Sequence, residues 1–183
     1  MIPAPFKVVL DANVLYPFSL RDTLLRAASE GLFQLYWSDQ ILEEARRSLV
    51  NSGRMTDERA TRLRAVMGEA FPEAMVTGHE PLIAAMKNDE KDKHVVAAAV
   101  KAGAQVIVTN NLKHFRELPE GIEAQSPDNF LCNVFDLDPD GMVEILREQA
   151  AALKKPKRSF EELLDGLSKF VPEFVAALRV HTK

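Results

Sequence analysis

The chain alternates short apolar runs with longer segments in which apolar residues recur at every third or fourth position. A short apolar run is typical of a strand buried on both faces, and the longer spacing is typical of a helix packed along one side. We expect strands near residues 6–10, 33–37, 75–77, 105–109 and 122–125. We expect helices between them near residues 17–31, 38–49, 56–71 and 93–102. This alternation predicts an α/β fold with a central parallel sheet.

The last third of the chain keeps the helical spacing and has no further strand pattern after residue 125. Ser126 and Pro127 indicate a helix start, because serine caps helices and proline suits their first position. Ser159 and Glu162 form a capping-box pattern at the start of another helix. Residues 136–141 have the composition of a hinge. The helices expected after that hinge lie near residues 139–153, 160–169 and 172–181.

Length and composition indicate an ordinary globular protein. Its 183 residues, 46% hydrophobic and 27% charged, are enough for one good core and a helical appendage. We expect an α/β domain over residues 1–137 and a helical extension over 138–183. No stretch approaches the roughly 20 apolar residues of a membrane span, and the first residues lack the features of a signal peptide. The single cysteine, Cys132, excludes an internal disulfide and suits a reducing cytoplasm.

The net charge of −4 does not indicate a nucleic-acid-binding protein, but basic residues cluster locally. One cluster crowds the stretch of the second and third expected helices and consists of Arg46, Arg47, Arg54, Arg59, Arg62 and Arg64. Lys87, Lys91 and Lys93 surround a pair of aspartates. Either cluster could be a solvated helix face or a surface that holds a phosphate backbone.

Acidic and amide residues follow several of the expected strands. They are Asp11 and Asn13 after the first strand, Glu44 about two turns into the helix that follows the second strand, Asp89 and Asp92 before the helix near 93–102, and Thr109, Asn110 and Asn111 after the strand near 105–109. The carboxyl ends of parallel strands meet at one edge of a sheet, so we expect these side chains to converge there. Converging carboxylates repel one another, and a hard divalent cation such as Mg²⁺ or Mn²⁺ would relieve that repulsion. Such an ion supports hydrolysis of a phosphodiester.

Simpler roles are open for each of these residues. Glu44, beside Glu43, could be solvated on a helix face, and Asp92 could cap the helix that follows it. His94 and His114 show no metal-ligand spacing, so we expect surface positions for both.

The segment after the first strand has no glycine, which disfavours a dinucleotide site or a Walker-type phosphate loop. The chain also lacks a strand–Gly-x-Ser-x-Gly–helix motif.

Four stretches, in this order and spacing, resemble the PIN domain, and specifically ribonuclease toxins of the VapC type. They are residues 8–15, 38–44, 89–95 and 106–111. The resemblance extends over roughly residues 6–135, and the tail from Ser126 is similar to that of a PIN subgroup of toxin components. The resemblance implies a PIN-like three-layer fold with a central parallel sheet and, in this chain, an α-helical C-terminal extension. It also implies a Mg²⁺- or Mn²⁺-dependent endoribonuclease.

The resemblance assigns the catalytic and metal-binding roles to Asp11, Glu44 and Asp92, with Asp89 as an auxiliary metal ligand. Glu44 is preferred to Glu43 because it lies six residues beyond Ser38, the family's spacing. Asn13, Thr109 and Asn111 would be supporting residues. The family's fourth acid normally follows the fourth strand, where this chain has Asn110 and Asn111, and this departure weakens the case for a second metal ion.

The same resemblance implies RNA as substrate and a protein antitoxin as partner, with a homodimer as a further option. The residues expected to hold RNA are Arg46, Arg47, Lys91 and Lys93. A degenerate PIN fold that acts as an RNA-binding or assembly module is the main alternative. A phosphatase or receiver-like domain with Asp11 as nucleophile is disfavoured, because Asn13 stands where a second aspartate would be required.

Overall fold

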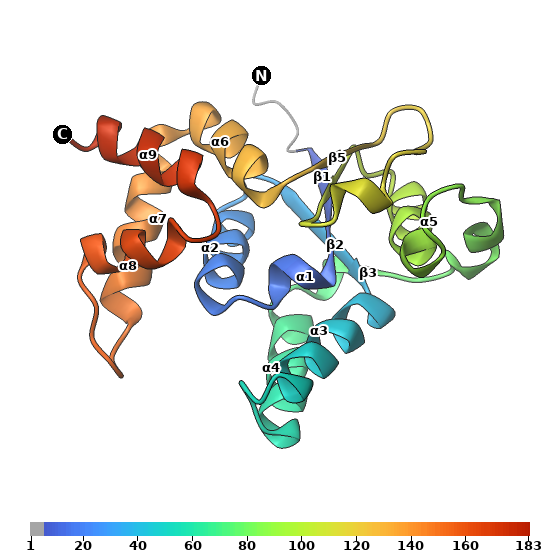
Figure 1. Cartoon of the computed structure of the whole chain (residues 1–183), viewed down its shortest axis with the longest axis horizontal. Helices are drawn as coiled ribbons and strands as arrows, with labels where there is room; N and C mark the ends of the chain where they lie inside the picture. Colours follow the sequence, from blue (N-terminus) through green and yellow to red (C-terminus); the bar gives the residue numbers. More distant parts are fainter. Residues whose placement is uncertain (1–5) are drawn as a thin grey trace. The chain divides into compact units, whose positions relative to one another are not determined.

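The computed structural model describes residues 6–183, and its course is drawn in Figure 1. The expected absence of a signal peptide concerns residues 1–5, which lie outside the described part. The contacts divide the chain into two compact units. An α/β unit comprises the chain up to Tyr16 and Phe33–Gln125, and a helical unit comprises Pro17–Leu32 and Ser126–Lys183. The division into domains at residue 137 stays a prediction, because contacts within one structure do not show which parts fold independently.

The α/β unit contains a five-stranded, all-parallel sheet. Its strands are β1 (Lys7–Leu10), β2 (Gln34–Ser38), β3 (Met75–Val76), β4 (Val106–Val108) and β5 (Glu123–Gln125). Their order across the sheet is β3-β2-β1-β4-β5. The expected α/β fold and its parallel sheet are therefore confirmed. All five strands lie where the apolar runs place them, and their ends differ by at most one residue.

The helices of this unit begin and end at recognisable capping residues. They are α1 (Ala12–Leu15), α3 (Asp39–Asn51), α4 (Asp57–Ala70) and α5 (Lys93–Ala102). The hydroxyls of Ser38 and Thr56 accept the first backbone N–H bonds of α3 and α4. Gly103 ends α5 with φ 68°, a left-handed conformation that favours glycine. The short η1 (Pro72–Ala74), η2 (Glu80–Ala85), η3 (Glu90–Asp92) and η4 (Leu112–His114) are 3₁₀ turns.

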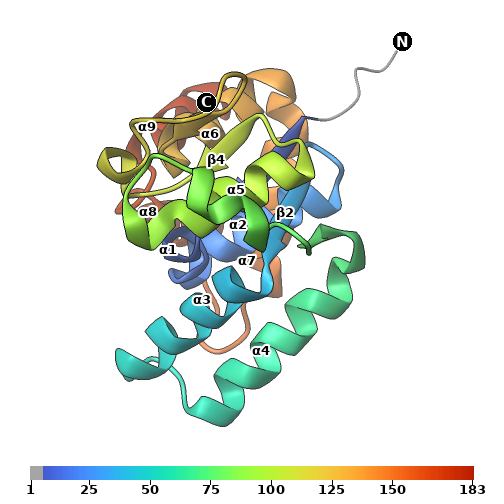
Figure 2. The same ribbon diagram turned by 90° about the vertical axis from the view of Figure 1, so that its right-hand side faces the viewer.

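Strand order decides which face of the sheet each helix covers. The chain moves from β1 outward to β3 and then returns to place β4 on the other side of β1. Because parallel crossovers are right-handed, this reversal puts α1 and α3 on one face and α5 on the other, which gives three layers (Figures 1 and 2). The central strands β1 and β4 are buried on both faces, and Val8, Val9 and Leu10 have no exposed surface. The reversal lies between β1 and β4, where such folds form a crevice.

The helical unit consists of α2 (Phe18–Ser29), α6 (Pro127–Leu137), α7 (Pro139–Ala152), α8 (Phe160–Leu167) and α9 (Pro172–His181). Its core is mostly apolar, but the side chains of Arg21, Thr23 and Gln149 are also buried, and the Thr23 hydroxyl donates to Gln149 at 2.8 Å. The capping box of Ser159 and Glu162 is confirmed. Within residues 136–141, where a hinge is expected, only Asp138 separates α6 from α7, and its carboxylate caps α7. The hinge stays a prediction. Among the described helices, none is long and apolar enough to cross a membrane.

Candidate active site

Asp11 lies in the crevice, between the end of β1 and the start of α1. Its N–H donates to the carbonyl of Val108 at 3.0 Å, which ties the ends of β1 and β4 together. One carboxylate oxygen accepts from the N–H of Ala12 at 2.7 Å, and the other accepts from the Thr109 hydroxyl at 2.8 Å. The side chain is 3% exposed. The pKa of Asp11 is raised to about 6, chiefly by burial and also by the carboxylates of Asp92 and Glu44, although the hydrogen bonds from Thr109 and Ala12 lower it.

Four polar residues form a frame around Asp11. The side-chain amide of Asn13 donates to Asp11 at 3.0 Å and to the Thr109 hydroxyl at 3.2 Å. The N–H groups of Asn110 and Asn111 donate to the Asn13 side-chain oxygen at 3.0 Å and to the Thr109 hydroxyl at 3.1 Å. Thr109 itself is fully buried. The segments after β1 and β4 therefore hold each other, and together they fix the direction of the Asp11 carboxylate.

The structure separates the roles of the neighbouring glutamates on α3. Glu43 accepts hydrogen bonds from Arg46, Arg47 and Arg64, of which Arg64 lies on α4. The bond from Arg46 is the main reason why the pKa of Glu43 falls to about 2. Glu43 thus joins two helices through ion pairs. Glu44 makes none of these arginine bonds in the described part of the chain.

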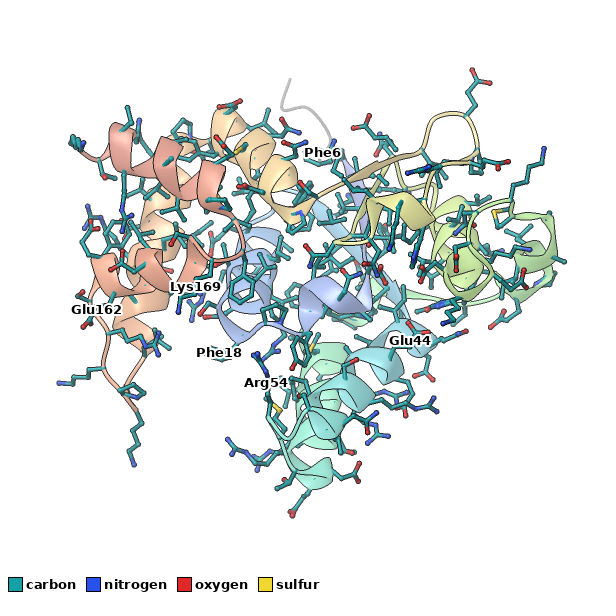
Figure 3. The ribbon with its side chains drawn as sticks, in the orientation of Figure 1. Phe6, Phe18, Glu44, Arg54, Glu162 and Lys169 are labelled. Carbon is teal, nitrogen blue, oxygen red and sulfur yellow. The ribbon has the colours of Figure 1, made fainter. Side chains whose placement is uncertain are left out.

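Glu44, labelled in Figure 3, lies on α3 with His94 and Gln40 as its partners. One carboxylate oxygen lies 2.9 Å from Nε2 of His94 on α5 and 3.5 Å from the amide nitrogen of Gln40. Its side chain is 36% exposed. The helix start at Ser38 decides that Glu44, and not Glu43, faces the crevice, because neighbouring residues of a helix point about 100° apart.

Asp92 reaches the same region from the turn before α5. It occupies the N-cap position but makes no capping bond, so a purely capping role is wrong. Its carboxylate instead lies 2.8 Å from Nδ1 of His114, in the turn after β4. One ligand atom from each of Asp89, Asp92 and His114 lies within 4.8 Å of the others, a grouping that could hold a metal ion. Two residues after β4 thus contact the acids: Thr109 bonds to Asp11, and His114 lies against Asp92. The sequence had given no site role to His114.

All three expected acids line one cavity of about 370 Å³. It is lined by Asp11, Ala12, Asn13, Glu44, Arg47, Ser48, Lys91, Asp92 and Asn111. The three acids expected at the site therefore line the same cavity as Arg47 and Lys91, two of the four cations expected to hold RNA. Thr109 and Asp89 do not line the cavity. Thr109 bonds to the Asp11 carboxylate, and Asp89 lies close to Asp92.

The remaining two cations have partners elsewhere. Arg46 bonds to carboxylates on α3 and at the start of α4. The Lys93 ammonium lies 2.7 Å from a carboxylate oxygen of Glu90. Arg47, although it bonds to Glu43 on α3, lines the cavity with Lys91.

The surface position expected for His94 is wrong. His94 is 4% exposed and lies among the buried residues at the start of α5. The apolar run that follows it was a usable signal, since a helix buried on most sides leaves little room for an exposed residue in its first turn. His114 is partly buried against Asp92, a pairing between distant segments that no local pattern indicates.

Comparisons with known proteins agree with this geometry. A family model described as "PIN domain" matches residues 7–113, and one described as "VapC50 C-terminal domain" matches residues 127–180. The chain is similar to "Putative ribonuclease VapC50" of Mycobacterium tuberculosis, at 42% identity over 109 residues. That match covers 58% of this chain and 64% of the relative, so it spans less than two thirds of the relative's length. The PIN model covers more than half of the chain and confirms the resemblance: this chain belongs to the PIN domain family.

Proposed function

We propose that this chain is a divalent-metal-dependent endoribonuclease and the toxin of a toxin–antitoxin pair. The observation that carries the proposal is the single cavity lined by Asp11, Glu44 and Asp92. These carboxylates come from three separate segments, and nothing in local helix or strand formation requires them to meet. The similarity to a protein named as a ribonuclease supports the same activity.

The donor set of the cavity fits Mg²⁺ or Mn²⁺. All three acids offer oxygen ligands, which these hard cations prefer. Asp11 is buried close enough to the other carboxylates that they raise its pKa, and an unneutralised group of this kind is unfavourable. We assign the ion to Asp11, Glu44 and Asp92, with Asp89 as auxiliary ligand. A bound cation would offset this repulsion and promote attack of water on a phosphodiester.

The other residues of the cavity have roles that follow from their contacts. Thr109 and Asn13 hold the Asp11 carboxylate in one direction. Asn111 lines the cavity, where its amide can bond to water or to a phosphate oxygen. Arg47 and Lys91 would hold the RNA backbone, and single-stranded RNA is the substrate class, because an unpaired strand can bend into a crevice. Arg46 and Lys93 would contribute at longer range.

We propose a protein antitoxin as the physiological partner, acting on cellular RNA in the cytoplasm. An acidic cavity favours an antitoxin segment that carries an arginine, because guanidinium binds carboxylates with two parallel bonds. Homodimer formation stays a prediction.

The central experiment is cleavage of a panel of single-stranded RNAs by the purified chain in EDTA, Mg²⁺ or Mn²⁺. We expect cleavage only with a divalent ion, and a loss of at least about 100-fold in Asp11→Asn and Asp92→Asn with the fold retained by circular dichroism. Glu44→Gln and Glu43→Gln form a matched pair of neighbouring acids. Glu44→Gln should lose cleavage, whereas Glu43→Gln should keep it.

Cleavage by Asp11→Asn at the wild-type rate, or wild-type cleavage in EDTA, would refute the proposed site. The alternative of an RNA-binding module predicts a different pattern. Such a module would bind RNA but would neither bind Mn²⁺ in calorimetry nor cut the RNA.

A further inference from the structure

We propose that His94 is a positioning residue: its buried imidazole holds the Glu44 carboxylate at the cavity that Glu44 shares with Asp11 and Asp92. This inference rests on the proposed function, because it concerns how the metal ligand Glu44 is kept in place. It assigns a role to a histidine that stands outside the cavity wall and has no place among the expected site residues.

The burial of His94 requires a polar partner. His94 is 4% exposed, and in the described part of the chain Nδ1 has no hydrogen-bond partner. Its Nε2 lies 2.9 Å from Glu44 without the geometry of a full hydrogen bond. A buried polar group without a partner is unfavourable by about 1–3 kcal/mol, so a histidine used only for packing would be a poor choice here. The contact with Glu44 is the polar interaction that explains this residue type at this position.

Glu44 needs such a contact. Its side chain is long and partly exposed, and fixing a free glutamate side chain costs up to about 2 kcal/mol of rotamer entropy. The nearby arginines bond to Glu43 instead. Among the described residues, Glu44 also accepts a long hydrogen bond of 3.5 Å from the side-chain amide of Gln40. A ring that contacts one carboxylate oxygen leaves the second oxygen free for a cation, whereas an arginine partner with two hydrogen bonds would occupy both.

The same arrangement recurs at the other two acids. Asp11 is held by the Thr109 hydroxyl, and Asp92 by the His114 ring. Each partner comes from an element other than the one that carries its acid. Partners that orient metal-binding carboxylates typically change metal affinity or activity by 10- to 100-fold when they are removed.

The test is Mn²⁺ binding by titration calorimetry, with the full chain and without RNA. We expect His94→Leu to weaken Mn²⁺ binding about 10- to 100-fold. His94→Gln should retain most of the affinity, because its amide can donate from nearly the place of Nε2. In His94→Asn, the shorter amide reaches only the position of Nδ1, so this variant should lose affinity as His94→Leu does. The asparagine variant therefore keeps the test decisive if the leucine variant does not fold.

A double-mutant cycle separates positioning from a general structural effect. In the Glu44→Gln background, His94→Asn should cause no further loss of Mn²⁺ affinity, because the group that it positions is already changed. An equal loss in both backgrounds would overturn the proposal, and so would an unchanged affinity in His94→Leu. The control is His79→Leu, since His79 is also 4% exposed with an unpartnered Nδ1, and no ion pair of the described residues includes it. This variant should keep its Mn²⁺ affinity.

The two proposals fail in different ways. If wild type binds Mn²⁺, Asp11→Asn does not, and His94→Leu binds like wild type, only the positioning role is wrong. If wild type binds no Mn²⁺, the proposed metal-dependent nuclease fails and the role of His94 fails with it.

Discussion

Asp11 shows how a residue that is unfavourable for folding can lie at the centre of a proposed site. Its carboxylate is almost fully buried, near two other acids, and it receives bonds from Thr109, Asn13 and Ala12 that only partly compensate. The raised pKa is the measure of that imbalance. The free chain holds the same carboxyl at its ordinary pKa of 3.8. The difference makes a prediction for stability as a function of pH.

Without metal, we expect Asp11→Asn to be more stable than wild type at neutral pH. The folded state binds the proton of Asp11 more tightly than the unfolded state, so wild type loses stability as pH rises from about 4 to about 6. Above that range the loss is constant, at about 3 kcal/mol if the whole shift is expressed. Denaturant unfolding in EDTA at pH 4 and pH 7.5 measures it. The two proteins should differ little at pH 4, and wild type matching the variant at pH 7.5 would contradict the prediction.

Individual elements place the site through their ends and through the bonds that fix them. Helix α3 begins at Ser38, and Glu43 ties it to α4 through Arg64, so the direction of Glu44 is set by two helices. Helix α5 carries Asp92 at its start and His94 in its first turn. In the helical unit, caps fix the starts of α8, α6 and α7, where backbone N–H groups of the first turn bond to the side chains of Ser159, Ser126 and Asp138.

The cap of α8 offers a test at the scale of one element. Ser159→Ala removes the side-chain bond to the N–H of Glu162 and the reciprocal capping box, and should lower the free energy of unfolding by about 1 kcal/mol. Ser159→Asp keeps an oxygen acceptor and should remain close to wild type. Urea denaturation followed by circular dichroism is the measurement. Equal stability of the alanine and aspartate variants would show that the cap contributes nothing.

For the molecule as a whole, charge limits how RNA can be held. The net charge is −4, and the cations that line the cavity are Arg47 and Lys91. Arg46 and Arg64 form ion pairs that join α3 to α4, so much of the arginine cluster serves the fold. We therefore expect the chain to hold RNA with few phosphate contacts and to depend on the metal site for the remainder.

Few phosphate contacts imply a weak dependence of RNA affinity on salt. For about two contacts, the logarithm of the binding constant should fall with a slope of about −1.4 against the logarithm of salt concentration. Arg47→Ala and Lys91→Ala should each reduce that slope by about 0.7. The control is Arg179→Ala, which should leave the slope unchanged, because Arg179 is paired with Glu161 and Asp165 and has no proposed role in holding RNA. Fluorescence anisotropy with the non-cleaving Asp11→Asn variant measures the slopes. A slope near −5 would indicate a broad basic surface instead.

The amino-acid sequence determined the elements of this protein. Apolar runs placed the five strands, and Ser38, Thr56, Gly103 and Ser159 set helix ends within a residue or two. These features are local, because backbone conformation and burial of one face depend on neighbouring residues. The sequence also provided the acids Asp11, Glu44 and Asp92, although their roles came from a family resemblance and not from local patterns.

The tertiary structure decided which side chains meet. No local pattern indicated that His94 would contact Glu44, that His114 would contact Asp92, or that Arg64 of α4 would bond to Glu43 of α3. Each of these contacts joins segments or faces whose proximity depends on how the helices pack on the sheet. The physical reason is that a spacing along the chain fixes the direction of a side chain, but its partner is fixed only when separate elements pack together.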